Sequence, residues 1–133
     1  MNKKCVLISG PTIAGDPKLG TEIQKNAIVL KNSDNQQILS ILKNQKVELI
    51  LFEIVNEYLS DIDLIKDIKT KFPEILILLI DGNGNRNLIA KAFQYGAKDA
   101  FRKPYKYDLI EERVRVLLNI KSNEKKRQTE GVI

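Results

Sequence analysis

Short apolar runs alternate along the chain with longer segments that carry hydrophobic residues at helical spacing. The runs cover residues 5–8, 27–30, 47–52 and 75–80, and a weaker fifth run covers 100–101. The four stronger runs are rich in branched aliphatics and show no polar alternation, which is typical of strands covered on both faces. The pattern therefore predicts a parallel sheet.

The segments between the runs predict the crossover helices that a parallel sheet requires. Their apolar stripes place the N-terminal caps at Ser33 or Asp34, Ser60 or Asp61, and Asn85 or Asn87, while the last helix covers residues 107–120. The first three of these helices end near Gln45, before Pro73, and at Gly96 in the C-terminal capping position.

The segment after the first apolar run is the poorest helix candidate, because Gly15, Pro17 and Gly20 fall inside it. We expect this helix to start late, with Asp16 as its cap and Pro17 at the first helical position. The complete pattern predicts an α/β fold of the (βα)₅ type, with five helices and one doubly wound, five-stranded parallel sheet of flavodoxin-like form.

Length and residue types narrow the possible functions. The 133 residues predict one domain over residues 1–120 and a tail or linker over 121–133. Cys5 is the only cysteine and histidine is absent, which excludes disulfide scaffolds, zinc sites of Cys and His, and imidazole chemistry. No apolar run is long enough to span a membrane and no secretion signal is visible, so we expect a cytoplasmic protein.

The charge gives a weak basic bias. The net charge is +5, of which residues 121–133 contribute +2, from four basic and two acidic side chains. The basic residues are scattered among acids rather than clustered with aromatics, so we do not expect nucleic-acid binding. A small basic module that binds nucleic acid through the tail stays an alternative.

Polar side chains follow the predicted strands at the edge where parallel sheets bind ligands. They are Ser9 and Gly10, Glu53, Asp81 and Lys103. Strand ends also carry polar residues simply because they reach water, so the pattern alone leaves both interpretations open.

The sequence around Glu53 and Lys103 resembles a known family. Residues 48–54 resemble the third strand of response-regulator receiver domains, with Glu53 in the place of the acceptor aspartate. Residues 92–105, with Gly96-Ala97 and Lys103-Pro104, resemble the family's fourth helix, fifth strand and lysine-proline signature. The similarity covers residues 3–120 and implies the strand order 2-1-3-4-5 and a role in bacterial two-component (phosphorelay) signalling.

Several positions depart from the family's pattern. Ser9 and Gly10 stand where receivers carry the acids that hold Mg²⁺, so we expect the metal site to be lost and no cofactor to bind. Glu53 is one methylene longer than aspartate and would misplace its carboxylate relative to a phosphoryl donor. The resemblance therefore implies a pseudo-receiver that cannot form the acyl phosphate.

The switch positions depart as well. Asp81 stands at the Ser or Thr position and cannot donate a hydrogen bond when ionised, and Ala100 replaces the aromatic switch residue. Only Lys103 remains of the reactive set. Its amine is long enough to bridge Glu53 and Asp81 as a permanent ionic latch, or it merely neutralises them. Glu53 imitating a phosphorylated aspartate is a third interpretation.

A glycine pair in the first loop invites a different hypothesis. Gly10 and Gly15 have the spacing of a phosphate-binding loop, but Asp16 and Pro17 follow where lysine and Ser or Thr are required. We therefore exclude a phosphate-binding loop of that type.

The last helix carries apolar residues off its core stripe, on the face that receivers use for dimers or effectors. The candidate interaction residues are Tyr95, Phe101, Arg102, Tyr105, Lys106, Leu109, Arg113 and Val116. We expect no catalysis and contact with a signalling protein, an effector domain or a second copy of the chain. The alternatives are a partly exposed helix with ordinary apolar scatter, a receiver that accepts phosphate at Asp81, and a flavodoxin-like enzyme with a bound cofactor.

Overall fold

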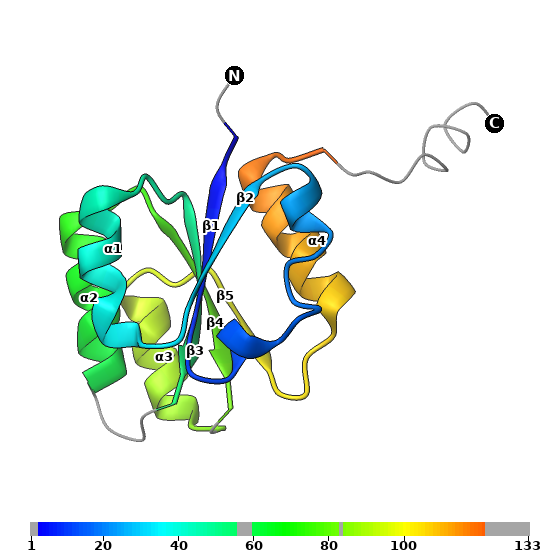
Figure 1. Cartoon of the computed structure of the whole chain (residues 1–133). Helices are drawn as coiled ribbons and strands as arrows, with labels where there is room; N and C mark the ends of the chain where they lie inside the picture. Colours follow the sequence, from blue (N-terminus) through cyan, green and yellow to red (C-terminus); the bar gives the residue numbers. More distant parts are fainter. Residues whose placement is uncertain (1–2, 56–59, 83, 122–133) are drawn as a thin grey trace.

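The computed structural model describes residues 3–55, 60–82 and 84–121, which form a parallel sheet between two helical layers (Figure 1). The sheet has five strands in the order β2-β1-β3-β4-β5, and all four pairings are parallel. The strands are β1 (Cys5–Ser9), β2 (Ile28–Asn32), β3 (Leu49–Ile54), β4 (Leu76–Asp81) and β5 (Asp99–Arg102). The predicted sheet and its strand order are confirmed.

Four α-helices lie within the described residues, where the sequence predicted five. They are α1 (Ile38–Asn44), α2 (Ser60–Lys71), α3 (Arg86–Gln94) and α4 (Tyr107–Leu118). The first three cover one face of the sheet and α4 covers the other (Figure 1). The tail expected over residues 121–133 lies outside the described residues, apart from Lys121.

Two predicted N-caps and one predicted C-cap are confirmed. Asp34 Oδ1 accepts a hydrogen bond of 3.0 Å from the backbone N of Gln36 at the 3₁₀ turn (Asn35–Gln37) that leads into α1. Asn85 Oδ1 accepts from the backbone N of Asn87 and Leu88 at the start of α3. Gly96 ends α3 with a φ of +113°, a left-handed conformation that glycine adopts without strain.

The crossover from β1 to β2 contains no α-helix, which corrects the prediction of a late-starting one. Its residues form two 3₁₀ turns, η1 (Ile13–Gly15) and η2 (Ile23–Lys25). Gly20 has a φ of +93°, which a right-handed helix cannot include. Asp16 caps no α-helix: its Oδ1 accepts from the backbone N of Lys18 at 3.0 Å within a turn.

A buried carboxylate from α4 replaces the backbone bonds that a helix would have made. Glu111 is 2% exposed and accepts hydrogen bonds from the backbone N of Gly20, Glu22 and Ile23 at 3.3, 3.0 and 3.0 Å. Since unpaired buried N–H groups are costly, Glu111 stabilises the only non-helical crossover of the described residues.

Side chains that alternate along the central strands form one core on each face of the sheet. Leu7, Ile50 and Phe52 pack beneath α1, α2 and α3, whereas Ile8 and Leu51 pack beneath α4 and the 3₁₀ turns. The central strands β1, β3 and β4 are therefore almost wholly buried, and their polar C-terminal residues meet at one edge. No described helix has the length and apolar character needed to cross a membrane.

The role of Glu111 gives a stability prediction. We expect Glu111→Ala to lower the free energy of unfolding by about 2–3 kcal/mol, because it leaves three backbone donors, two of them buried, without an acceptor. Glu112→Ala is the matched control: its side chain is 55% exposed and, among the residues that the structure describes, pairs only with Arg115 in the same helix, so a loss below about 0.5 kcal/mol is expected. Urea unfolding measures both, and equal losses would contradict the role of Glu111.

Candidate functional site

The Glu53 carboxylate lies at the C-terminal edge of the sheet inside a ring of hydrogen-bond donors. Its side chain is fully buried near the end of β3. Oε1 accepts from the backbone N of Thr12 at 2.9 Å and of Ile13 at 3.1 Å. Oε2 accepts from the Thr12 hydroxyl and from Lys103 Nζ. Four donors from the first loop and the end of β5 thus hold one carboxylate.

Lys103 reaches this carboxylate from the rim of the sheet. Its side chain is 31% exposed, and its Nζ also donates to the Thr12 hydroxyl at 2.7 Å. The expected bridge from Lys103 to Asp81 is not found within the described part of the chain, where the lysine pairs only with Glu53. Asp81 Oδ1 instead accepts from the backbone N of Gly84 at 2.9 Å, since the loop after β4 turns back over it.

Gly10 provides the space that the longer glutamate side chain needs. A Cβ atom at position 10 would lie 2.3 Å from both Cβ and Oε1 of Glu53, far inside van der Waals contact. Any side chain at this position, including the acid found in the family, would displace Glu53. The two departures from the receiver pattern, glycine at 10 and glutamate at 53, therefore form one packing unit.

Ser9 belongs to a buried network rather than to an open pocket. Its hydroxyl donates to Asn35 Oδ1 at 2.7 Å and accepts from Asn32 Nδ2 at 2.9 Å. Asn35 Nδ2 in turn donates to the backbone O of Glu53 at 2.9 Å. The Ser9 side chain thus fixes the backbone of β3 instead of facing a ligand.

The residues at this edge do not fit the magnesium ion that receivers use. Mg²⁺ requires near-octahedral oxygen coordination with carboxylates, and both Glu53 oxygens already accept hydrogen bonds while Gly10 offers no side chain. Across residues 3–55, 60–82 and 84–121, no three Asp, Glu, Cys or His side chains gather as metal ligands would.

The donors also determine the charge of Glu53. Burial by itself would raise the pKa of the carboxyl group, but hydrogen bonds from Lys103, Thr12 and Ile13 outweigh it and hold the pKa below its ordinary value of 4.5. Glu53 is therefore an ionised, buried and fully hydrogen-bonded group at neutral pH.

A second anchor fixes the far end of the first loop. Tyr105 donates from its hydroxyl to Asp16 Oδ2 at 2.7 Å, and Tyr107 donates to the same oxygen at 2.9 Å. Burial and the Asp16 carboxylate raise the pKa of Tyr105, which keeps this hydroxyl protonated. Tyr105, a candidate for external contact, is thus half-buried and engaged with the loop.

Three other candidate interaction residues also contact the protein itself. Lys66 Nζ of α2 lies 5.4 Å from the ring centroid of Tyr95, and Phe101 packs against the core on the α4 side. Arg113 Nε pairs with Asp99 Oδ2 at 3.2 Å.

The remaining candidates stay exposed. Arg102 and Lys106 are exposed, and on α4 the side chains of Leu109 and Val116 are 55% and 60% exposed. Phe93 on α3 is 42% exposed and was not among the predicted contact residues. Exposed apolar side chains on both α3 and α4 are therefore available to a partner.

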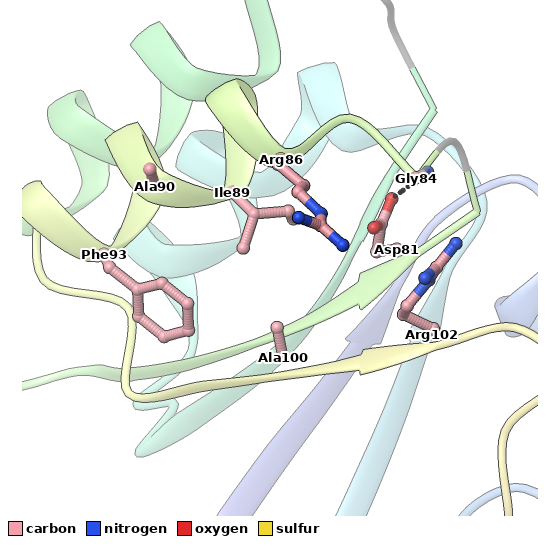
Figure 2. A pocket seen from close by; sticks show the side chains of 8 residues that line it. All are labelled: Asp81, Gly84, Arg86, Ile89, Ala90, Phe93, Ala100 and Arg102. Atoms are coloured by element: carbon pink, nitrogen blue, oxygen red, sulfur yellow. Dashed lines mark hydrogen bonds between the residues drawn. The ribbon is translucent and has the colours of Figure 1, made fainter.

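A pocket of about 500 Å³ lies between α3 and β5 (Figure 2). Ala100 forms part of its floor, and this is the residue that stands at the aromatic switch position in the resemblance to receivers. The other residues lining it are Asp81, Gly84, Arg86, Ile89, Ala90, Phe93 and Arg102.

Sequence reasoning missed the donors that matter most at Glu53. Thr12 lies in the glycine-containing loop that was considered only as a phosphate-binding loop and excluded. The available signal was a hydroxyl residue two positions after Gly10, opposite a glutamate where the family has aspartate. That pairing indicates that the glutamate side chain at the end of β3 is long enough to reach Thr12 in the first loop.

Comparison with known proteins gives one family. The family model for the response regulator receiver domain matches residues 18–115. The sporulation initiation phosphotransferase F of Bacillus subtilis (strain 168) is 24% identical over 130 residues, covering 92% of this chain and 99% of that protein. The chemotaxis protein CheY of the same organism is 25% identical over 92 residues, covering 69% of this chain and 77% of that protein.

Solved structures agree with the fold. The receiver domain protein (CheY-like) from Methanospirillum hungatei JF-1 superposes with a TM-score of 0.78 at 18% identity, covering 89% of this chain and 95% of that one. The BeF3-activated DrrB receiver domain gives a TM-score of 0.75 at 18% identity, covering 90% of this chain and 99% of that one.

The depressed pKa of Glu53 gives a pH prediction. A lowered folded-state pKa adds stability that is present above the unfolded value near 4.5 and is lost as pH falls through the folded value. We expect Glu53→Gln to lower the free energy of unfolding by about 1–3 kcal/mol at neutral pH. The difference between variant and wild type should shrink as the pH falls below 4.5 and through the lower folded-state pKa of Glu53. Urea unfolding across pH measures it.

Glu74→Gln is the control, because this side chain is exposed, and its difference from the wild type should stay near zero at every pH. A Glu53→Gln difference that does not change with pH would show that the charge of Glu53 contributes nothing to stability.

Proposed function

The chain belongs to the response regulator receiver family, and within it we propose a pseudo-receiver that takes no phosphate and acts by contact with another protein. The proposal keeps the general role of receivers in two-component signalling and removes the phosphoryl step. The hydrogen-bonded Glu53 carboxylate is the observation that carries it.

Phosphoryl transfer to a carboxylate needs a free oxygen in line with the donor and cations that neutralise the developing charge. Both oxygens of Glu53 accept two hydrogen bonds each, and the loop containing Thr12 lies directly against them. Gly10 cannot gain an acidic side chain without displacing Glu53. These contacts disfavour both the metal and the acyl phosphate.

The same contacts favour a permanent ionic latch over the other interpretations of Glu53. Lys103 and Thr12 connect the end of β5 and the first loop to β3 through one carboxylate. A phosphorylated aspartate would present close to two charges and three acceptor oxygens to mobile groups, whereas Glu53 presents one charge to groups that already contact it. In the proposal, the domain therefore stays in one conformation without a phosphorylation signal.

Contact with a partner is supported by the exposed apolar side chains of α3 and α4. Phe93 on α3 and Leu109 and Val116 on α4 are exposed large hydrophobics, and burying such side chains against a partner would remove apolar area from water. The partner in this proposal is a signalling protein or an effector domain. The proposal also includes a second copy of the chain as the partner, which would give a homodimer.

The proposal predicts no stable phosphoprotein. With Mg²⁺ and a small acyl-phosphate donor, intact-mass spectrometry should detect no gain of about 80 Da, the mass of one phosphoryl group, because both oxygens of Glu53 already accept hydrogen bonds and the residues around them do not fit Mg²⁺. A phosphate-accepting receiver treated in parallel controls for donor activity.

An adduct in the wild-type protein would overturn the proposal, and mapping it separates two cases. An adduct on Glu53 would show that the hydrogen-bonded carboxylate opens. An adduct lost in Asp81→Asn would identify a working receiver with a displaced acceptor.

A further inference from the structure

The pocket between α3 and β5 has two chemically different ends (Figure 2). Ile89, Ala90, Phe93 and Ala100 form an apolar end, toward the C-terminal half of α3. The other end is basic. It carries the guanidinium groups of Arg86 and Arg102, which lie on either side of Asp81 (Figure 2).

The apolar end exists because the residue at position 100 is small. Ala100 is half-buried on β5 and carries no atom beyond Cβ, so its side chain leaves space between β5 and α3. Phe93 stands at the side of this space and is 42% exposed. A pocket of about 500 Å³ with apolar walls is large enough to bury a large side chain of a partner.

The basic end carries charge that the described residues do not neutralise. Within those residues, the guanidinium groups of Arg86 and Arg102 make no hydrogen bond and no ion pair. Asp81 is 6% exposed, and its Oδ1 is held by the backbone N of Gly84. Two guanidinium groups beside one buried carboxylate leave a net positive end.

We propose that this pocket binds a segment of a partner protein in which a large apolar side chain stands beside one or more carboxylates. The apolar side chain occupies the space above Ala100, and the carboxylates pair with Arg86 and Arg102. Arginine suits this role because its planar group binds carboxylates through two parallel hydrogen bonds. This inference rests on the proposed function of protein contact and names the chemistry of the partner.

A library of random dodecapeptides displayed on phage, selected on the full chain, tests the proposal. We expect the enriched sequences to share an aromatic or large aliphatic residue next to Asp or Glu. A synthetic peptide of the enriched sequence should bind Ala100→Leu at least about tenfold more weakly, because leucine fills the apolar end from the sheet side.

A charge-reversal variant tests the basic end of the pocket. Arg102→Glu should weaken the same peptide at least about tenfold, whereas Lys43→Glu, an equal charge change at an exposed position of α1, should leave its affinity unchanged. Melting temperatures of the three variants confirm that each is folded. If the selected peptides lack the apolar or acidic residue, if they bind Ala100→Leu as tightly as the wild type, or if the library yields none, the proposal is wrong.

The result is separable from the proposed function. Peptides that lose binding in Leu109→Glu/Val116→Glu but not in Ala100→Leu would overturn the pocket and leave protein contact through α4 intact. A phosphoryl adduct on the wild-type protein would overturn the proposed function whatever the peptides do.

Discussion

One buried negative charge determines how the functional edge of this protein is built. The carboxylate of Glu53 has left water completely, and burying a charge is costly unless it is paired and hydrogen-bonded. Thr12, Ile13 and Lys103 supply that compensation. The first loop must therefore lie against β3, Gly10 must lack a side chain, and Lys103 must point inward, so Gly10, Glu53 and Lys103 each have a structural role at this edge.

The same principle operates on the side of the sheet that α4 covers. The crossover from β1 to β2 lacks an α-helix, and three of its backbone donors are satisfied by Glu111, while Asp16 accepts from Tyr105 and Tyr107. Carboxylates thus fix the first loop at three points along its length. Moving this loop would break these hydrogen bonds, which supports the proposal of a domain that stays in one conformation without a phosphorylation signal.

The sequence predicted the sheet well because its central strands are runs of branched aliphatics that must be buried on both faces. It failed at the first crossover, where Gly20 takes a left-handed conformation that no apolar spacing reveals. The length of Lys103 left open whether its amine bridges Glu53 and Asp81. Within the described residues the amine contacts Glu53 and Thr12, and the sequence could not place Thr12 because its position depends on the conformation of the first loop.

The most direct test of this account is a crystal structure of the protein grown with magnesium and beryllofluoride. The account predicts that Glu53 keeps its contacts with Thr12, Ile13 and Lys103 and that neither ion lies at the end of β3. Beryllofluoride bonded to the Glu53 carboxylate, with Mg²⁺ beside it and the first loop displaced, would contradict it.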